Sequence, residues 1–469
     1  MGITDAARPI AQALKQACPV PRDGRADATR LEEEVAQYLP DANLATHVGF
    51  ELQLEGELRI AVAAYRRAIA LDATRFDAWY ALGCAELGQG SEAEAIRLID
   101  CSLAEQPAVM GAAARIRDFS KGRNVTYSRK VFLPITNLCR DRCTYCTFRK
   151  DPGDPGAWTM SPSEIAAWSR AGYELGCKEA LMCLGDKPEI AFKEYREVLS
   201  GLGVRTTIEY VARACEIAIA QGLLPHTNAG LMTYDEMKML RPLNASMGLM
   251  LESISPRLRA SGGCHQWAPD KEPALRMAVL KAAGQLRIPF TTGILLGIGE
   301  TIAERAQSLI AIRDLNEKYG HIQEVIIQNF RAKPEIPMAE APEPAAMEMA
   351  RAIATARLVL GATMNVQAPP NLSPHEVELF LDAGINDWGG ISPLSKDYVN
   401  PEAPWPHLER LSERCAAKGF NLCERLAIYP EYIDETWVDE SIRPRVDRLS
   451  AGICRITEVN RDPESGRTG

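Results

Sequence analysis

The chain has 469 residues, of which 46% are hydrophobic and 25% are charged, and its formal net charge is −9. This length exceeds a typical domain of about 100–200 residues, so we expect a large core domain and a smaller module. The acidic balance argues against a nucleic-acid partner, and the absence of a signal peptide or an apolar run of ~18 residues predicts a cytoplasmic protein with no membrane association.

The first part of the chain contains an internal repeat. Residues 1–43 are expected to be helical, without a firmer assignment. Within residues 44–118, a shift of 34 residues superposes Gly49 on Gly83 and Gly56 on Gly90. This period, with small residues at the helix crossings, resembles the tetratricopeptide (TPR) repeat. Such a module either docks a partner protein or caps its own chain, and the sequence favours neither.

From residue 125 onward, strands alternate with helices. Short β-branched runs such as RKVFLPIT are followed by helices with capping signals, at Ser161, Thr233, Thr301 and Ser373. At least six such units over roughly 260 residues predict an α/β fold with a parallel sheet, most simply a full or partial (β/α) barrel over residues 125–433. An open doubly wound sheet is the alternative. Residues 434–469 are expected to form a C-terminal extension that is partly disordered.

Three cysteines lie within eight residues, directly after the first predicted strand. Cys139, Cys143 and Cys146 have the spacing C-x3-C-x2-C. Barrel enzymes place their chemistry in the loops at the carboxyl ends of the strands, where this segment is expected. Zinc sites usually have four cysteine or histidine ligands, and no fourth one is close in the sequence. The triplet therefore favours a [4Fe–4S] cluster with one open iron, and a zinc site completed by a distant ligand is the alternative.

With Tyr145 before the last cysteine, this spacing is the signature of the radical S-adenosylmethionine (SAM) enzymes, and the chain resembles them. In that superfamily the open iron chelates the amino and carboxylate groups of SAM, and one electron cleaves SAM to a radical that abstracts hydrogen from the substrate. The resemblance implies that the three cysteines hold the cluster. It also implies a set of SAM-binding residues in and behind the cysteine loop, namely Tyr145, Gly185, Asp186, Glu189, Glu252, Gly293 and Gly297.

Longer segments narrow the resemblance to one subfamily. GCKEALMCLGDKPE, RIPFTTGILLGIGET and HIQEVIIQNFRAKPEIPMA are similar to the cyclising (CofG-type) subunit of 7,8-didemethyl-8-hydroxy-5-deazariboflavin (FO) synthase. The resemblance runs from about Val125 to about Ile433. It implies a lyase of coenzyme F420 biosynthesis, which closes the deazaflavin ring of a hydroxybenzyl-ribityl-diaminouracil adduct with loss of ammonia. A radical SAM enzyme of a quinone or thiamine pathway and a TPR scaffold with structural zinc are the alternatives.

The same resemblance implies partners and substrate contacts. A separate CofH-type 5-amino-6-(D-ribitylamino)uracil–L-tyrosine 4-hydroxyphenyl transferase would supply the adduct, and flavodoxin or ferredoxin would donate electrons. We expect residues 261–271 to form a mobile loop over the site. Amide and acidic side chains near strand ends are candidates for substrate contact, although ordinary loop hydrogen bonds explain each at least as well: Asn228, Gln328, Asn329, Gln367, Asn371, Asn386 and Asp387.

Overall fold

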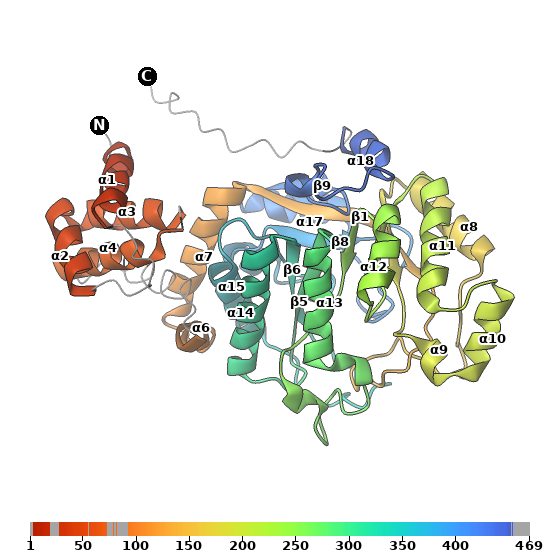
Figure 1. The fold of residues 1–469 in the computed structure, drawn as a ribbon. Helices are drawn as coiled ribbons and strands as arrows, with labels where there is room; N and C mark the ends of the chain where they lie inside the picture. The colour runs from red at the N-terminus through yellow and green to blue at the C-terminus, as the bar shows by residue number, and fades with distance from the viewer. Residues whose placement is uncertain are drawn as a thin grey trace.

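The computed structural model contains an N-terminal group of helices beside a larger α/β domain (Figure 1). The first group comprises α1 (Ile3–Ala17), α2 (Ala28–Tyr38), α3 (Ala42–Leu54) and α4 (Leu58–Leu71). The residues that the structure describes are 3–18, 28–54, 56–72, 78, 81, 92–451 and 453.

The helices α1 to α4 share an apolar core of their own, which includes Leu14, Val35 and Leu52. Helix α3 crosses α4 at a glycine, because a Cβ atom at Gly49 would lie 2.4 Å from the ring of Tyr65. This is a close crossing of the kind that the repeat pattern predicts. The repeat partners Gly83 and Gly90 lie outside the described residues, so the TPR assignment stays a prediction.

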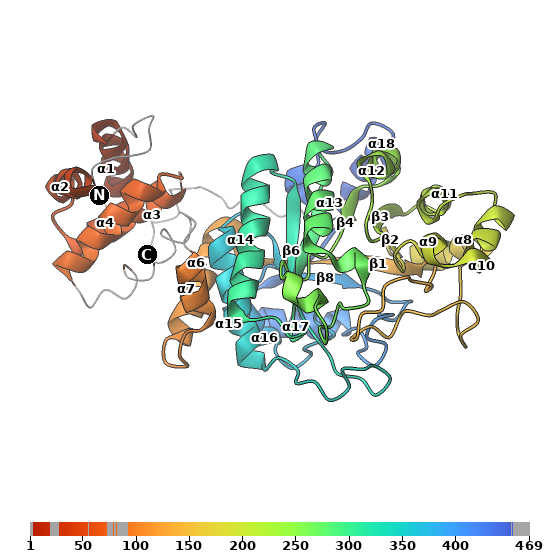
Figure 2. The ribbon, with the colours of Figure 1, turned by 60° about the horizontal axis from the view of Figure 1, so that its bottom comes forward.

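Two further helices join this group to the α/β domain. Helices α6 (Glu92–Ile99) and α7 (Gln106–Lys121) contribute side chains to the same apolar core as the barrel helices. The guanidinium of Arg117 in α7 is buried and donates hydrogen bonds to the carbonyl oxygens of Leu381 and Ile385. The last helices of the predicted repeat region therefore pack into the large domain, beside α15 (Ala346–Leu360) (Figure 2).

The large domain is a closed parallel barrel of eight strands. This confirms the predicted (β/α) barrel and shows that the barrel is full and not partial. Each strand pairs with the next, and the eighth pairs back with the first. A ninth strand, β9 (Asn421–Arg425), runs parallel to the first half of β1. The barrel strands are β1 (Asn124–Pro134), β2 (Glu179–Cys183), β3 (Leu224–Asn228), β4 (Ser246–Gly248), β5 (Phe290–Leu296), β6 (Ile322–Asn329), β7 (Val366–Gln367) and β8 (Asp387–Ile391).

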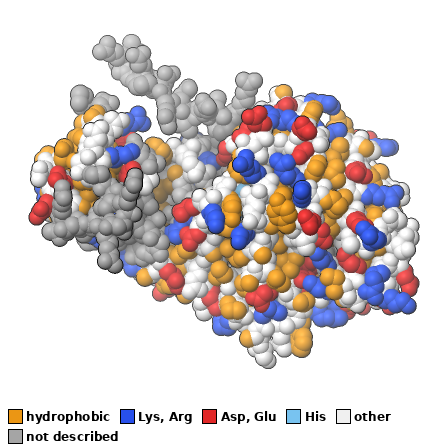
Figure 3. Space-filling view, viewed as in Figure 1, with side chains coloured by type: hydrophobic (Ala, Val, Ile, Leu, Met, Phe, Trp, Pro, Cys, Tyr) orange, Lys and Arg blue, Asp and Glu red, His pale blue; other side chains and the backbone are white. Residues whose placement is uncertain are grey.

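Helices surround this barrel. They are α8 (Pro162–Glu174), α9 (Pro188–Ala191), α10 (Lys193–Gly201), α11 (Thr207–Ala220), α12 (Tyr234–Leu240), α13 (Pro273–Gln285), α14 (Ile302–Tyr319), α15 (Ala346–Leu360), α16 (Val377–Asp382), α17 (Leu408–Ala417) and α18 (Arg443–Ser450). Short 3-10 helices are η1 (Arg241–Leu243), η2 (Pro256–Arg259), η3 (Pro269–Lys271) and η4 (Pro430–Tyr432). Figure 3 shows acidic and basic side chains interspersed over one face of this domain. Within the part of the chain described, every helix is too short or too polar to cross a lipid bilayer.

The capping signals identify most helix starts. Ser161, Thr233 and Thr301 each form a capping box with a glutamate three residues later. The start predicted at Ser373 is wrong, because α16 begins only at Val377. The Ser373 hydroxyl instead faces the side chain of Asn329, and its carbonyl closes a turn that precedes the helix.

A buried ionic network closes the amino end of the barrel. Arg425 of β9 pairs with Asp387 at 2.6 Å and with Glu324 at 2.8 Å. The Asp387 carboxylate also accepts a hydrogen bond from Thr126 in β1. Asp387 thus lies at the start of β8, directly after Asn386, and neither residue lines the cavity at the cysteine loop. Substrate contact by these two residues stays a prediction.

Candidate active site

One cavity of about 400 Å³ connects the cysteine loop with the barrel interior. The sulfur-bearing residues Cys139, Cys143 and Cys146 all line it. Charged and polar residues from several strands line it as well, and they are Lys130, Glu179, His226, Glu324 and Arg425. A polar small molecule that enters this cavity would therefore reach both the cysteines and the ionic interior.

Two other segments hold the cysteine loop in place. The backbone N–H of Asp186, in the turn after β2, donates to Cys139 Sγ at 3.1 Å. The N–H groups of Arg142 and Thr144 donate to the carbonyls of Trp267 and Cys264, at 2.9 and 3.1 Å. Residues 261–271, expected to be a mobile loop over the site, thus contact the cysteine loop through backbone hydrogen bonds.

The cysteines suit an iron–sulfur cluster better than a single zinc ion. Zinc about 2.3 Å from each sulfur would bring tetrahedral sulfurs to within about 3.8 Å of one another. Among the described residues, the three cysteine sulfurs do not meet even a 4.8 Å limit, so they leave room for a larger group. Burial also raises the pKa of Cys139 to about 12, and a thiolate at this depth needs a positively charged ligand.

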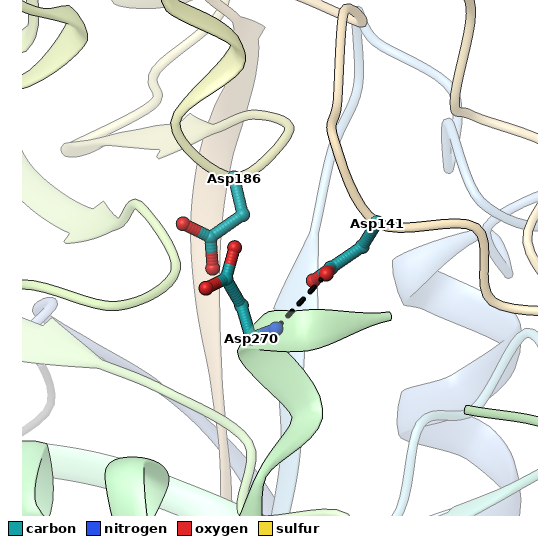
Figure 4. Close-up of side chains that lie close together, drawn as sticks. All are labelled: Asp141, Asp186 and Asp270. Carbon is teal, nitrogen blue, oxygen red and sulfur yellow. Dashed lines mark hydrogen bonds between the residues drawn. The ribbon is translucent and has the colours of Figure 1, made fainter. Parts of the chain in front are cut away.

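Three aspartates converge beside the cysteine loop (Figure 4). The carboxylate oxygens of Asp141, Asp186 and Asp270 lie within 4.8 Å of one another, and Asp270 N–H donates to Asp141 Oδ1 at 3.0 Å. The guanidinium of Arg140 pairs with both oxygens of Asp270. Burial, together with the charge of Asp270, raises the pKa of Asp186 to about 7. Asp186 Oδ1 is buried with no hydrogen-bond partner among the described residues, and the residue lines the cavity.

Glu252 gathers several polar side chains around its carboxylate in the same cavity. The Tyr145 hydroxyl donates to its carboxylate at 2.5 Å, His265 lies 3.2 Å away, and Lys271 forms an ion pair with it. Burial acts to raise the pKa of Glu252, but Lys271 and His265 hold it below its ordinary range. Its φ of 63° is a left-handed conformation that non-glycine residues rarely adopt, and such strain is common at functional sites.

The predicted SAM-binding residues fall into two groups. Tyr145, Gly185, Asp186 and Glu252 line the cavity together with the cysteines. The others pack against protein: Glu189 accepts a hydrogen bond from Thr207 N–H at 3.1 Å, Gly293 faces the backbone of Ile326, and Gly297 faces Pro344. Contact between any of these seven residues and SAM stays a prediction.

The sequence interpretation missed most of the charged cavity wall. His226 is buried in β3, and burial lowers its pKa to about 4, which leaves a neutral imidazole at pH 7. Lys130 and Glu179 form an ion pair of 2.7 Å between β1 and β2. Charged residues inside otherwise apolar strands are the sequence feature that could have indicated this polar cavity. Five of the predicted amides do line the cavity, and they are Asn228, Gln328, Asn329, Gln367 and Asn371.

Comparisons with known proteins agree with this geometry. Residues 133–310 match the model of the radical SAM superfamily. The chain is 50% identical to a 7,8-didemethyl-8-hydroxy-5-deazariboflavin synthase of Methanopyrus kandleri, over 70% of this chain and 98% of that protein. The chain belongs to the 7,8-didemethyl-8-hydroxy-5-deazariboflavin synthase family. It is also 46% identical to the protein of that name from Methanothermobacter thermautotrophicus, over 69% of this chain and 98% of the relative.

Larger family relatives extend beyond this chain. The FO synthase of Streptomyces coelicolor is 45% identical over 88% of this chain, but the match covers only 46% of that protein. The chain thus spans about half the length of this relative and nearly all of the Methanopyrus and Methanothermobacter proteins.

Solved structures show the fold alone. The hydrogenase maturase HydG of Carboxydothermus hydrogenoformans superposes with a TM-score of 0.59 at 16% identity, over 90% of this chain and 88% of HydG. Methylornithine synthase (PylB) superposes with a TM-score of 0.56 at 16% identity, over 72% of this chain and 97% of its own.

Proposed function

We propose that this protein is the radical SAM enzyme that closes the deazaflavin ring of FO, in coenzyme F420 biosynthesis. Its substrate is the adduct of a hydroxybenzyl group with ribityl diaminouracil, and ammonia is lost on ring closure. The observation that carries the proposal is the 50% identity over 98% of a relative with this named activity, in a chain whose three cysteines open onto one cavity.

The cysteine loop would hold the cofactors. Cys139, Cys143 and Cys146 are the ligands of a [4Fe–4S] cluster, which together with SAM supplies hydrogen abstraction from the substrate. The orphaned Asp186 Oδ1 is a suitable acceptor for the amino group of SAM, because a buried acceptor without a partner is costly. Glu252, already oriented by Tyr145 and Lys271, is placed to accept hydrogen bonds from the SAM ribose.

The rest of the cavity would bind the adduct. Its ribityl hydroxyls and its uracil ring need hydrogen-bond donors and acceptors, which the amides and charged side chains of β3, β6 and β7 offer. The surrounding barrel buries these groups and strengthens each polar contact by excluding water. Neutral His226 is a suitable proton acceptor at this site.

Two kinds of partner follow from the proposal. A CofH-type transferase on another chain would supply the adduct, since this chain covers 46% of the Streptomyces FO synthase. Flavodoxin or ferredoxin would donate the electron, and Arg142, which is exposed within the cysteine loop and pairs with Asp151, is a candidate contact for such a carrier. The α1–α4 module is a candidate TPR-like docking surface for a protein partner.

A coupled fluorescence assay tests this function. The anaerobically reconstituted protein is mixed with a CofH-type transferase, SAM, a reductant, tyrosine and the ribityl diaminouracil. We expect deazaflavin fluorescence that requires both proteins. A cluster-loaded protein that cleaves SAM without forming a deazaflavin would instead indicate another radical SAM reaction.

A further inference from the structure

Only two lysines are buried among the described residues, and one of them has no counter-ion. Lys130 is 9% exposed and pairs with Glu179 at 2.7 Å. Lys333 is 5% exposed, and the one hydrogen bond that its ammonium group makes in the described structure runs from Nζ to the carbonyl oxygen of Arg331 at 3.1 Å. None of the described carboxylates lies within 4.0 Å of this ammonium group. A buried lysine is rarely left unpaired, because burying a lone charge is costly.

Lys333 lines the cavity and has donors to spare. An ammonium group has three N–H donors, and the Arg331 carbonyl accepts from only one of them. Lys333 lines the cavity in the loop that follows β6. Burial lowers its pKa, although the charges of Glu402 and Asp397 partly oppose this effect. These features are those of an amine that completes its hydrogen bonds with a ligand.

Asn371, in the loop after the neighbouring strand β7, offers the complementary group. Both donors of its amide are used, because Nδ2 donates to Asp397 Oδ2 at 3.0 Å and to the carbonyl of Ala403 at 3.3 Å. This pattern fixes the orientation of the amide. Asn371 is 3% exposed and lines the cavity, and its Oδ1 is buried with no partner among the described residues.

The carboxylate of Asp397 makes this arrangement rigid. Besides Asn371, it accepts hydrogen bonds from the N–H groups of Val399 and Asn400, at 2.9 and 3.0 Å. It also accepts one from Asn400 Nδ2 at 3.2 Å. Asn371 Oδ1 is therefore held in a preformed position, which lowers the entropic cost of binding a ligand.

We propose that Lys333 and Asn371 bind the pyrimidinedione edge of the substrate, with Lys333 donating to a ring carbonyl and Asn371 Oδ1 accepting the adjacent ring N–H. This inference rests on the proposed function and names residues that recognise its substrate. The pair projects from the loops after β6 and β7, whereas the residues assigned to the cluster and to the SAM amino and ribose groups follow β1, β2 and β4. A neighbouring carbonyl and N–H on one ring edge need one donor and one acceptor, which Lys333 Nζ and the fixed Asn371 Oδ1 supply.

The test is the affinity of the cluster-loaded enzyme for FO, the product, which retains this ring edge. We expect Lys333→Met to weaken FO binding at least about tenfold in a fluorescence titration and to raise the KM for the adduct, because it leaves ligand polar groups unpaired. Lys333→Arg should recover part of the affinity. Asn371→Leu should weaken FO binding as well. The loss of FO affinity in the double variant should be smaller than the product of the fold-losses in the two single variants. Iron content and SAM affinity should stay at the wild-type level.

A matched control is Lys178→Met, which removes a half-buried lysine that pairs with Glu424 away from the cavity. It should leave FO affinity unchanged. If Lys333→Met fails to load its cluster, Lys333→Gln and Asn371→Leu carry the same test. The inference would be overturned if the Lys333 and Asn371 variants bound FO as tightly as the wild type, or if they lost affinity for SAM and not for FO. In either case, turnover by the wild-type enzyme would still support the proposed function. A wild-type enzyme that neither makes nor binds FO would refute both.

Discussion

Gly185 lies where the turn after β2 meets the cysteine loop, and we predict that Gly185→Ala disrupts this contact. An added Cβ atom would lie 2.1 Å from the carbonyl oxygen of Leu138 and 2.6 Å from Cys139 Cβ. Real Cβ contacts essentially never fall below 3.0 Å, so the turn and the loop must separate by about 0.9 Å, the difference between 3.0 and 2.1 Å. Neither neighbour can rotate away, because one is backbone and the other is the first carbon of a proposed cluster ligand.

The size of the effect follows from this displacement. Overpacking of this kind lowers the free energy of unfolding by about 1–3 kcal/mol. A shift of about 1 Å in a group that positions the chemistry can reduce turnover about 100-fold. It would also lengthen the hydrogen bond from Asp186 N–H to Cys139 Sγ, now 3.1 Å. We therefore expect less iron and sulfide per chain after reconstitution, and a turnover about two orders of magnitude below wild type.

Gly201→Ala is the matched control. Gly201 ends helix α10, and a Cβ atom there would have no neighbour within 4 Å. This change should leave cluster content and turnover unchanged, and it should raise the free energy of unfolding by up to about 1 kcal/mol. If Gly185→Ala loads a full cluster and turns over at the wild-type rate, the inferred packing of the cysteine loop is refuted.

Three further predictions concern the cluster, the barrel and pH. Cys143→Ala should lose iron, sulfide and turnover but keep the circular dichroism of the wild type, and surviving turnover would refute the cluster assignment. Asp387→Asn should lower the free energy of unfolding by about 3 kcal/mol, because it removes the negative charge that neutralises the buried Arg425 guanidinium. An unchanged midpoint of urea unfolding would contradict this role. Hydrogen bonding to Arg257 lowers the pKa of Glu304 from 4.5 to about 2. The ionised Glu304 carboxylate therefore stabilises the folded protein above pH 4.5, and this stabilisation is lost as the pH falls toward 2. Glu304→Gln should thus be less stable than wild type by about 1 kcal/mol at pH 6 and should converge with it at low pH, whereas a constant difference in urea titrations would count against the ion pair.

Local signals explain why most of the barrel could be predicted. The capping boxes at Ser161, Thr233 and Thr301 act within four residues and are readable without the fold. Strand β8, with the sequence DWGGI, was not predicted, because two glycines weaken its strand character. The false helix start at Ser373 has the same local pattern as the true ones, but its hydroxyl faces the side chain of Asn329, the last residue of strand β6.

The site likewise has a part that the sequence predicts and a part that only the structure shows. The cysteine spacing lies in one short loop, so the sequence alone suggested the cluster. The ionic interior depends on residues far apart in the chain, such as Arg425 and Glu324, which only the closed barrel brings to 2.8 Å. The missing counter-ion of Lys333 is likewise invisible in the sequence, because it depends on which carboxylates fold nearby. The roles of Gly293 and Gly297 in packing against Ile326 and Pro344 also required the structure.

The most direct test of the account is a turnover measurement with the purified hydroxybenzyl-ribityl-diaminouracil adduct as the sole substrate. Cluster-loaded protein, SAM and a reductant are incubated without any transferase, and the products are identified by mass spectrometry. The account predicts FO, ammonia and 5′-deoxyadenosine, all absent when Cys143→Ala replaces the wild type. Unconverted adduct after incubation with protein that holds a complete cluster and binds SAM would contradict it.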